Sequence, residues 1–280
     1  MIGDKIVKIL NAPVVEQIYN DGVKQIVVPI GDTISLLPRA IHAALHPLEK
    51  WILEREHSLD ETEKMLIEKL EKCNPESIVS PDAHIAVPAL QYIGYCMDNN
   101  ELRTMYANLL ANSMVNFTKS GVHPAFVELI KQLSPDEAKI LRYIYGKRKI
   151  PILSVRHTNE KGVGKSVLVN FSDVGFSVGC EKPEDVRKYF DNLMRLGLIN
   201  KSDKGRKLAN NRKYDELIHH PIVVNISKLS DDEMSAGMNS VKYYRRYMEI
   251  TEFGRSFCSI CLDEPFKNIN NDSNLTGVAQ

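Results

Sequence analysis

The spacing of apolar residues changes along this 280-residue chain, and the change divides it into two parts. Up to about residue 131, apolar residues recur every three or four positions, as they do on one face of a helix. Further along, segments 150–155 and 166–171 are rich in β-branched residues and flank a polar, glycine-containing stretch, which predicts a β-hairpin. Because 280 residues is also long for one domain, we expect two domains.

Residues 1–131 are predicted to form the first, helical domain. In segment 32–56, apolar residues lie three or four positions apart, and Pro38 and Pro47 are expected to break or kink the helix. In segment 99–117, Met105 and Leu109 are expected to face inward, with small residues between them that allow close helix approach. Successive helices joined by short loops indicate a bundle.

Residues 134–265 are predicted to form the second domain. Ser134 and Glu137 form a capping box at a helix start, the predicted hairpin follows, and a strong helix over 183–197 ends at Gly197. A strand, a polar connection and a strand ending at Thr251 then lead into a last helix, which Thr251 caps. This order is typical of a winged-helix domain with an inserted hairpin. The fold class is therefore mainly α, with a helical N-terminal domain, a winged-helix-like α+β C-terminal domain, and a disordered polar tail over 266–280.

The sequence Gly164-Lys165-Ser166 matches the end of a nucleotide-binding phosphate loop. However, Asn159 occupies the position of the first glycine, and the residues after Ser166 predict a strand, which offers no helix dipole to a phosphate. We therefore interpret the stretch as a hairpin tip in which Gly162 and Gly164 adopt positive φ.

No other local pattern identifies a catalytic, cofactor-binding or metal site. His42 and His46 have a spacing that can share a metal, but Pro47 follows directly and disturbs the geometry. Cys258 and Cys261 have a redox-like spacing without the βαβ setting or second cysteine pair that such sites need, so core packing is favoured. With no nucleophile elbow either, we expect a protein that is not an enzyme.

Charge is distributed unevenly although the net charge is zero. Residues 139–213 contain 18 basic and 7 acidic residues, a net charge of +11. Such a segment favours either nucleic acid or a contact with an acidic protein surface, between the two halves of the chain or between subunits of a homo-oligomer. An odd number of cysteines (five), no long apolar stretch and no leader pattern predict a cytoplasmic protein.

The basic segment supplies the candidate contact residues, which lie on the predicted helix 184–197 and in the polar connection after it. Glu184, Asp185 and Asp191 share the surface of that helix and weigh against a nucleic-acid contact there. A basic connection is nevertheless well suited to phosphate contacts. The candidates are Arg187, Lys188, Asn192, Arg195, Lys201, Lys204, Arg206, Lys207, Arg212 and Lys213.

A membrane-surface alternative rests on segment 33–53, which is amphipathic and ends near Trp51, the single tryptophan. Its polar side is not lysine-rich, so packing inside the bundle is the favoured interpretation.

Segments 13–25, 77–117 and 122–144 together resemble the bacterial abortive infection alpha family. The resemblance extends over roughly residues 10–262 and is clearest at 78–145. It implies a role in defence against phage, in which the infected cell is arrested or killed before progeny emerge, and it assigns no catalytic residues. We therefore expect an anti-phage protein that acts by binding, either to nucleic acid or to a partner, as a homo-oligomer or with a defence-system protein. The alternatives are a winged-helix DNA-binding transcription regulator and a membrane-associated effector.

Overall fold

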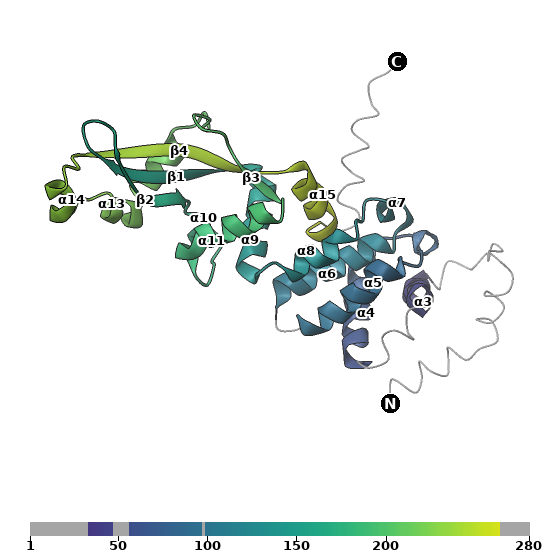
Figure 1. Cartoon of the computed structure of the whole chain (residues 1–280). Coiled ribbons are helices and arrows are strands. Elements are labelled where there is room, and N and C mark those ends of the chain that lie inside the picture. The colour runs from purple at the N-terminus through teal and green to yellow at the C-terminus, as the bar shows by residue number, and fades with distance from the viewer. Residues whose placement is uncertain (1–32, 47–55, 97–98, 264–280) are drawn as a thin grey trace, which may run out of the picture. The chain divides into compact units, whose positions relative to one another are not determined.

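A computed structural model describes residues 33–46, 56–96 and 99–263 (Figure 1). Of the described residues, those from 37 onward belong to one compact unit. This part of the chain is mainly helical and contains a four-stranded antiparallel sheet. The predicted tail over 266–280 lies outside the described residues.

The helices before residue 134 surround α6 (Asn100–Ser113), which is buried along most of its length. Asn99 begins α6 by accepting a hydrogen bond from the Leu102 N–H, and Met105 and Leu109 are fully buried, which confirms the predicted inward face. The other elements of this part are α3 (Thr33–Leu45), α4 (Glu56–Leu70), the 3₁₀ turn η3 (Pro75–Ser77), α5 (Ala83–Tyr95), α7 (Asn116–Lys119) and α8 (Ala125–Lys131).

Helix α3 continues through Pro38, so the prediction of a break there is wrong. Pro38 removes one backbone hydrogen bond, but Leu37 and Ile41 on either side of it are buried in the core. Packing of this apolar face stabilises the helix despite the missing bond. Pro47 and Trp51 lie outside the described residues.

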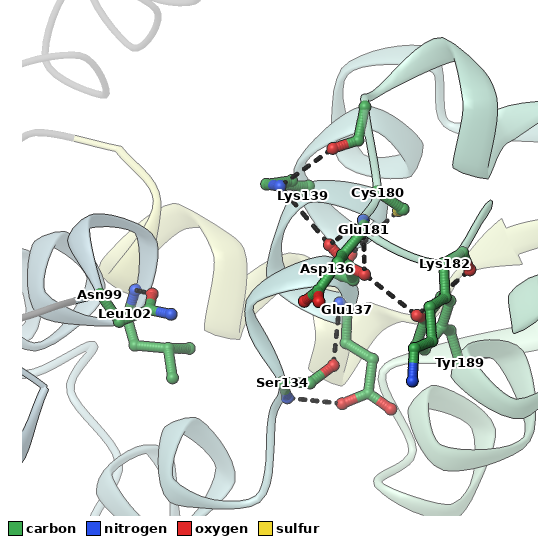
Figure 2. A network of polar contacts seen from close by, with 11 residues as sticks. Asn99, Leu102, Ser134, Asp136, Glu137, Lys139, Cys180, Glu181, Lys182 and Tyr189 are labelled. Carbon is green, nitrogen blue, oxygen red and sulfur yellow. Dashed lines mark hydrogen bonds and ion pairs between the residues drawn. The ribbon is translucent and has the colours of Figure 1, made fainter.

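The second part begins at α9 (Pro135–Lys147), where the predicted capping box is present. Ser134 Oγ accepts from the Glu137 N–H, and Glu137 accepts from the Ser134 N–H (Figure 2). The helix predicted over 183–197 ends before Gly197, which has φ +72°, and Thr251 caps the last helix. Both predicted boundaries are therefore confirmed. The elements that follow α9 are β1 (Lys149–Thr158), β2 (Gly164–Phe171), α10 (Val174–Ser177), the 3₁₀ turn η4 (Pro183–Asp185), α11 (Val186–Arg195), β3 (Ile199–Lys201), α12 (Arg212–Ile218), α13 (Pro221–Ile226), α14 (Asp231–Ser235), β4 (Ser240–Ile250) and α15 (Glu252–Cys261).

The sheet has the strand order β2-β1-β4-β3, with the long strands β1 and β4 in its centre (Figure 1). Successive side chains of a strand point to opposite faces. On one face, Ile150 and Met248 pack into the main helical core. On the other face, Leu153 and Val155 form a smaller cluster with residues of α12 and α13. The sheet is therefore covered on both faces, by different helices.

The segment between β3 and β4 differs from the predicted polar connection, because it contains three short helices. Tyr214 of α12 is fully buried and donates its hydroxyl hydrogen to the Arg246 carbonyl at 2.8 Å. Leu217 and Val223 are also buried, against the sheet face that carries Leu153. In the sequence, these apolar residues are separated by many charged residues and form no helical or strand periodicity. The local sequence therefore does not predict that they pack against a sheet.

The hairpin tip is formed as predicted, with one difference. Gly162 has φ +76° and permits the turn that Asn159 closes. Gly164 does not have positive φ; it lies in β2, and a Cβ there would overlap the His157 carbonyl oxygen. Gly164 is thus needed because β1 and β2 approach closely at this position.

The core is continuous across the predicted domain boundary at 131–134. Helix α15, from the second predicted domain, packs against α6 of the first. The side chains of Asn108 and Asn112 donate to the carbonyls of Cys261 and Ile260, each at 2.9 Å. These bonds satisfy carbonyl groups at the C-terminal end of α15, where no helical partner remains.

Candidate functional site

Lys165, the candidate phosphate-binding lysine, forms an ion pair with α14. Its Nζ lies 2.8 Å from Glu233 Oε1, and Nδ1 of the buried His157 lies 3.1 Å from Glu233 Oε2. Lys165 first, then the Ser230 N–H and His157, lower the pKa of the Glu233 carboxyl to about 2. Ser166 belongs to β2 and pairs with Arg156. The Gly-Lys-Ser stretch therefore joins the hairpin to α14, and no helix follows it to bind a phosphate.

The four candidate residues on α11 are engaged in contacts within the protein. Arg187 lies 3.9 Å from Asp191, and Lys188 lies 2.8 Å from Asp185. Asn192 donates to the Gln132 carbonyl, and Arg195 donates to the Gln132 side chain. The acidic residues that weighed against a nucleic-acid contact thus neutralise two of the cations. Asn192 and Arg195, the other two candidates, fix the loop before α9 through their hydrogen bonds to Gln132.

The six candidates after α11 separate into two groups. Arg206 and Arg212 form ion pairs with Asp203 and Glu216, and Lys213 is an exposed residue of α12. The remaining three lie together and line a groove, whose volume is about 900 Å³. They are Lys201, Lys204 and Lys207.

The groove lies on the part of the sheet that the main helical core leaves open. Ser154 and Arg156 of β1 lie on the same face as Ile150, further along the strand, and Tyr244 is the partner of Ser154. Lys201 of β3 reaches the same face, because it pairs with Met248. The lining residues are Ser154, Arg156, Ser166, Val169, Asn170, Lys201, Lys204, Gly205, Lys207, Tyr243, Tyr244, Arg245 and Arg246.

Six of these lining residues are cationic, and none is acidic. Arg245 pairs with Asp215 at 3.5 Å, and Lys207 donates to the Asn211 side chain. In contrast, Lys201, Lys204 and Arg246 form no ion pair within the described residues. A concave surface lined by cations and free of carboxylates concentrates positive potential and attracts an anionic ligand.

Two polar residues at the floor of the groove have unusual conformations or contacts. Arg156 donates to the Gly164 carbonyl at 2.7 Å, while its Nε is buried and has no hydrogen-bond partner among the described residues. Asn170 has φ +55°, is 6% exposed, and donates its backbone N–H to Ser154 Oγ. Asn170 lies between Leu168 and Phe171, in a stretch of β2 where the register with β1 shifts and the ladder is locally disrupted.

Comparison with family models gives a match to abortive infection alpha over residues 54–261. The chain belongs to the abortive infection alpha family. The match includes β1, β2, β3 and β4 and therefore the whole groove. Comparison with curated proteins gave no significant match. A solved structure of an uncharacterized protein from the marine bacterium Alcanivorax borkumensis SK2 is 17% identical, with a TM-score of 0.35, over 49% of this chain and 92% of that chain.

In this member of the abortive infection alpha family, the described residues contain no group of three His, Cys, Asp or Glu that could hold a metal ion. Cys258 and Cys261 are fully buried in the core, and burial raises the pKa of both thiols. This confirms their interpretation as core residues. Among the helices of the described ranges, none is both long and apolar enough to cross a bilayer.

Several groove residues of this family member were not predicted from the sequence. Tyr244 and Arg246 belong to β4, whose partner residues on β1 lie about 90 positions earlier in the sequence, so their proximity to Arg156 is not a local property. A signal was nevertheless present: two tyrosines followed by two arginines, at 243–246, lie within a strand-like segment. Alternation along that strand places one tyrosine and one arginine on each face.

Proposed function

We propose that this chain is an abortive-infection-type defence protein that acts by binding nucleic acid in the groove on its sheet, and not by catalysis. The observation that carries the proposal is the lining. Apart from Tyr243 and Arg245, whose side chains lie on the opposite face of β4, it has five cations and Tyr244, and it contains no carboxylate. Membership of the family supplies the biological setting.

The physical basis is charge neutralisation of phosphates. A nucleic acid carries one negative charge for each phosphate, and lysine or arginine contacts release the counterions condensed around it. Lys201, Lys204 and Arg246 are available for such contacts because no carboxylate of the described residues neutralises them. Binding of this kind weakens as salt rises, with a slope of about 0.7–0.9 for each phosphate neutralised.

Replacing Lys201, Lys204 and Arg246 together by glutamine is expected to lower the affinity for a mixed-sequence oligonucleotide at least tenfold. The logarithmic salt slope should fall by about 2–3, since three phosphate contacts are lost. Fluorescence anisotropy across a salt series measures both quantities. A matched variant changes Arg187, Lys188 and Arg212 to glutamine, which removes the same charge from cations that already have carboxylate partners.

The matched variant should bind within about threefold of the wild type, because rim charges outside a site act weakly. Equal losses in the two variants would show that only net charge matters, and the groove would lose its assigned role. The same pair of variants serves in cells challenged with phage. Wild type and matched variant should protect the culture, and the groove variant, at equal protein level, should not.

The winged-helix-like arrangement is retained as an interpretation of residues 134–265. Its support is the element order α9, β1, α10, α11, β3, β4 and the placement of β4 between β1 and β3. A transcription regulator of this type would insert α11 into the major groove of DNA. The internal contacts of Arg187, Lys188, Asn192 and Arg195 favour the sheet groove over α11 as the binding surface.

Two further hypotheses have direct tests. Homo-oligomerisation, or binding to a defence-system protein, is measured by light scattering of the purified chain and by co-purification. A membrane-surface role is tested by vesicle co-sedimentation. It would require the apolar face of α3, yet Leu37, Ile41 and Ala44 on that helix are buried in the core.

A further inference from the structure

We infer that the groove takes a single-stranded nucleic acid, with Tyr244 stacking on one base and the Asn170 side chain at that base's edge. This inference rests on the proposed function and specifies its ligand. The chemistry is shared by single-stranded RNA and single-stranded DNA.

The shape of the basic surface favours a single strand. A protein that reads duplex DNA inserts a helix or a two-stranded ribbon into a major groove about 12 Å wide, so its contact surface is convex. Here the cations without carboxylate partners line a concave groove of about 900 Å³. The exposed helix that could be inserted, α11, has its basic residues in internal ion pairs and hydrogen bonds. A flexible single strand can follow a groove that a duplex cannot enter.

Tyr244 offers a ring on which a base can stack. Its side chain is on the groove face of β4, between the positions of Lys242 and Arg246, and the residue is 45% exposed. The ring makes no aromatic contact within the described part of the chain. The neighbouring Tyr243 is directed to the other face, where its hydroxyl lies 3.2 Å from Ser227 Oγ. Proteins that bind single strands combine a basic groove with exposed aromatic rings on which bases stack, whatever the base.

Asn170 places an amide in the groove through an uncommon backbone conformation. A non-glycine residue at φ +55° is rare, and strained backbone of this kind persists where the surroundings hold it and often at binding sites. Its backbone is fixed through Ser154, and its side-chain amide lines the groove without a hydrogen bond to the described residues. An amide offers both donors and an acceptor, as base edges do. Strain that places this amide in the groove, next to Ser154 of β1, which in turn pairs with Tyr244, therefore has a use in base recognition.

The test measures anisotropy of labelled 12-nucleotide RNA, the same sequence as single-stranded DNA, and the DNA duplex, all at one salt concentration. Both single strands are expected to bind at least tenfold more tightly than the duplex. Tyr244→Leu should weaken single-strand binding about tenfold, since base–aromatic stacking is lost, whereas Tyr244→Phe should retain it. Tyr95→Leu, at an exposed tyrosine of α5 outside the groove, is the control and should have no effect.

Asn170→Gly removes the side-chain amide, while glycine adopts positive φ without strain. A change in base preference in this variant is therefore due to the missing amide and not to a changed backbone. This variant should fold at least as stably as the wild type. Across a panel of four homopolymer single strands, it should reduce the spread of affinities to within about twofold, while the wild type prefers one base severalfold.

The outcomes separate the inference from the proposed function. If duplex and single strand bind equally and Tyr244→Leu has no effect, while the Lys201, Lys204 and Arg246 variant still loses affinity, the single-strand inference is overturned and the proposed function stands. If none of the three nucleic acids binds even at low salt, both are overturned. Tighter binding of RNA than of DNA, or the reverse, supports the inference and identifies the strand.

Discussion

Replacing Gly254 by alanine is expected to destabilise the protein by about 3 kcal/mol or more. Gly254 lies in the first turn of α15, where the helix passes directly over Leu198, the residue before β3. A Cβ at this position would overlap the Leu198 carbonyl oxygen and lie 2.8 Å from its carbonyl carbon. The obstacle is backbone, which cannot rotate away as a side chain can. The helix would therefore have to move, and its packing against α6 would be lost with it.

Urea unfolding monitored by circular dichroism measures this effect. Gly146→Ala is the matched control, because Gly146 also lies in a helix, is exposed, and has no atom within 4 Å of the position that a Cβ would take. Alanine there should stabilise the protein by up to about 1 kcal/mol, through helix propensity alone. Similar stabilities for the two variants would show that α15 is not held against Leu198 as described.

Replacing Asp136 by asparagine is expected to cost about 2–4 kcal/mol of stability. The carboxylate accepts hydrogen bonds from the Glu181 N–H at 3.0 Å, from the Tyr189 hydroxyl at 3.0 Å, and from Lys139 at 3.4 Å (Figure 2). It thereby joins the start of α9 to the loop before α11 and to α11 itself. Asparagine has the same shape, but its NH₂ group cannot accept, so donors that face the carboxylate would be left unsatisfied.

The pH dependence gives a second measurement. Partial burial alone would raise the pKa of the Asp136 carboxyl, but the bonds from Glu181, Tyr189, Lys182 and Lys139 together lower it below its ordinary value. A lowered pKa stabilises the fold above the unfolded pKa of about 3.9, and this contribution is lost as the pH falls through the folded value. The stability difference between wild type and Asp136→Asn should therefore be constant at neutral pH and shrink below about pH 4.

The control for this substitution is Asp191→Asn. Within the described part of the chain, Asp191 forms only an exposed ion pair with Arg187, at 3.9 Å, and its loss should cost at most about 0.5 kcal/mol. A comparable loss in the two variants, or a difference that persists unchanged at pH 3, would contradict the assigned role of the Asp136 carboxylate.

The features that could be predicted from the sequence are those with local causes. The capping box at Ser134, the positive φ of Gly197 and the cap at Thr251 each depend on residues within a few positions, and all three are confirmed. The hairpin is confirmed for the same reason. Helices α12, α13 and α14 were missed because residues such as Tyr214 become apolar contacts only when a distant sheet face lies against them.

The groove was predictable only in part, for a similar reason. Of the ten candidate contact residues, Lys201, Lys204 and Lys207 line it, because they follow α11 closely along the chain. Arg156, Asn170 and Arg246 join them through strand pairings that depend on register between distant segments. Positive charge alone does not distinguish a free cation from one that an acidic neighbour already neutralises, as the ion pairs of α11 show.

The junction between β4 and α15 has a mechanical consequence. Only Thr251 separates the two elements, and its side chain bonds both to the Gly197 carbonyl and to the Gly254 N–H. Five positions before it, on the same strand, is Arg246 of the groove. Because the connection has no further residue, β4 and α15 cannot change their relative position without breaking the Thr251 bonds, and α15 is bonded in turn to Asn108 and Asn112 of α6. Thr251 therefore fixes β4, the turn at Gly197 and the start of α15 to one another.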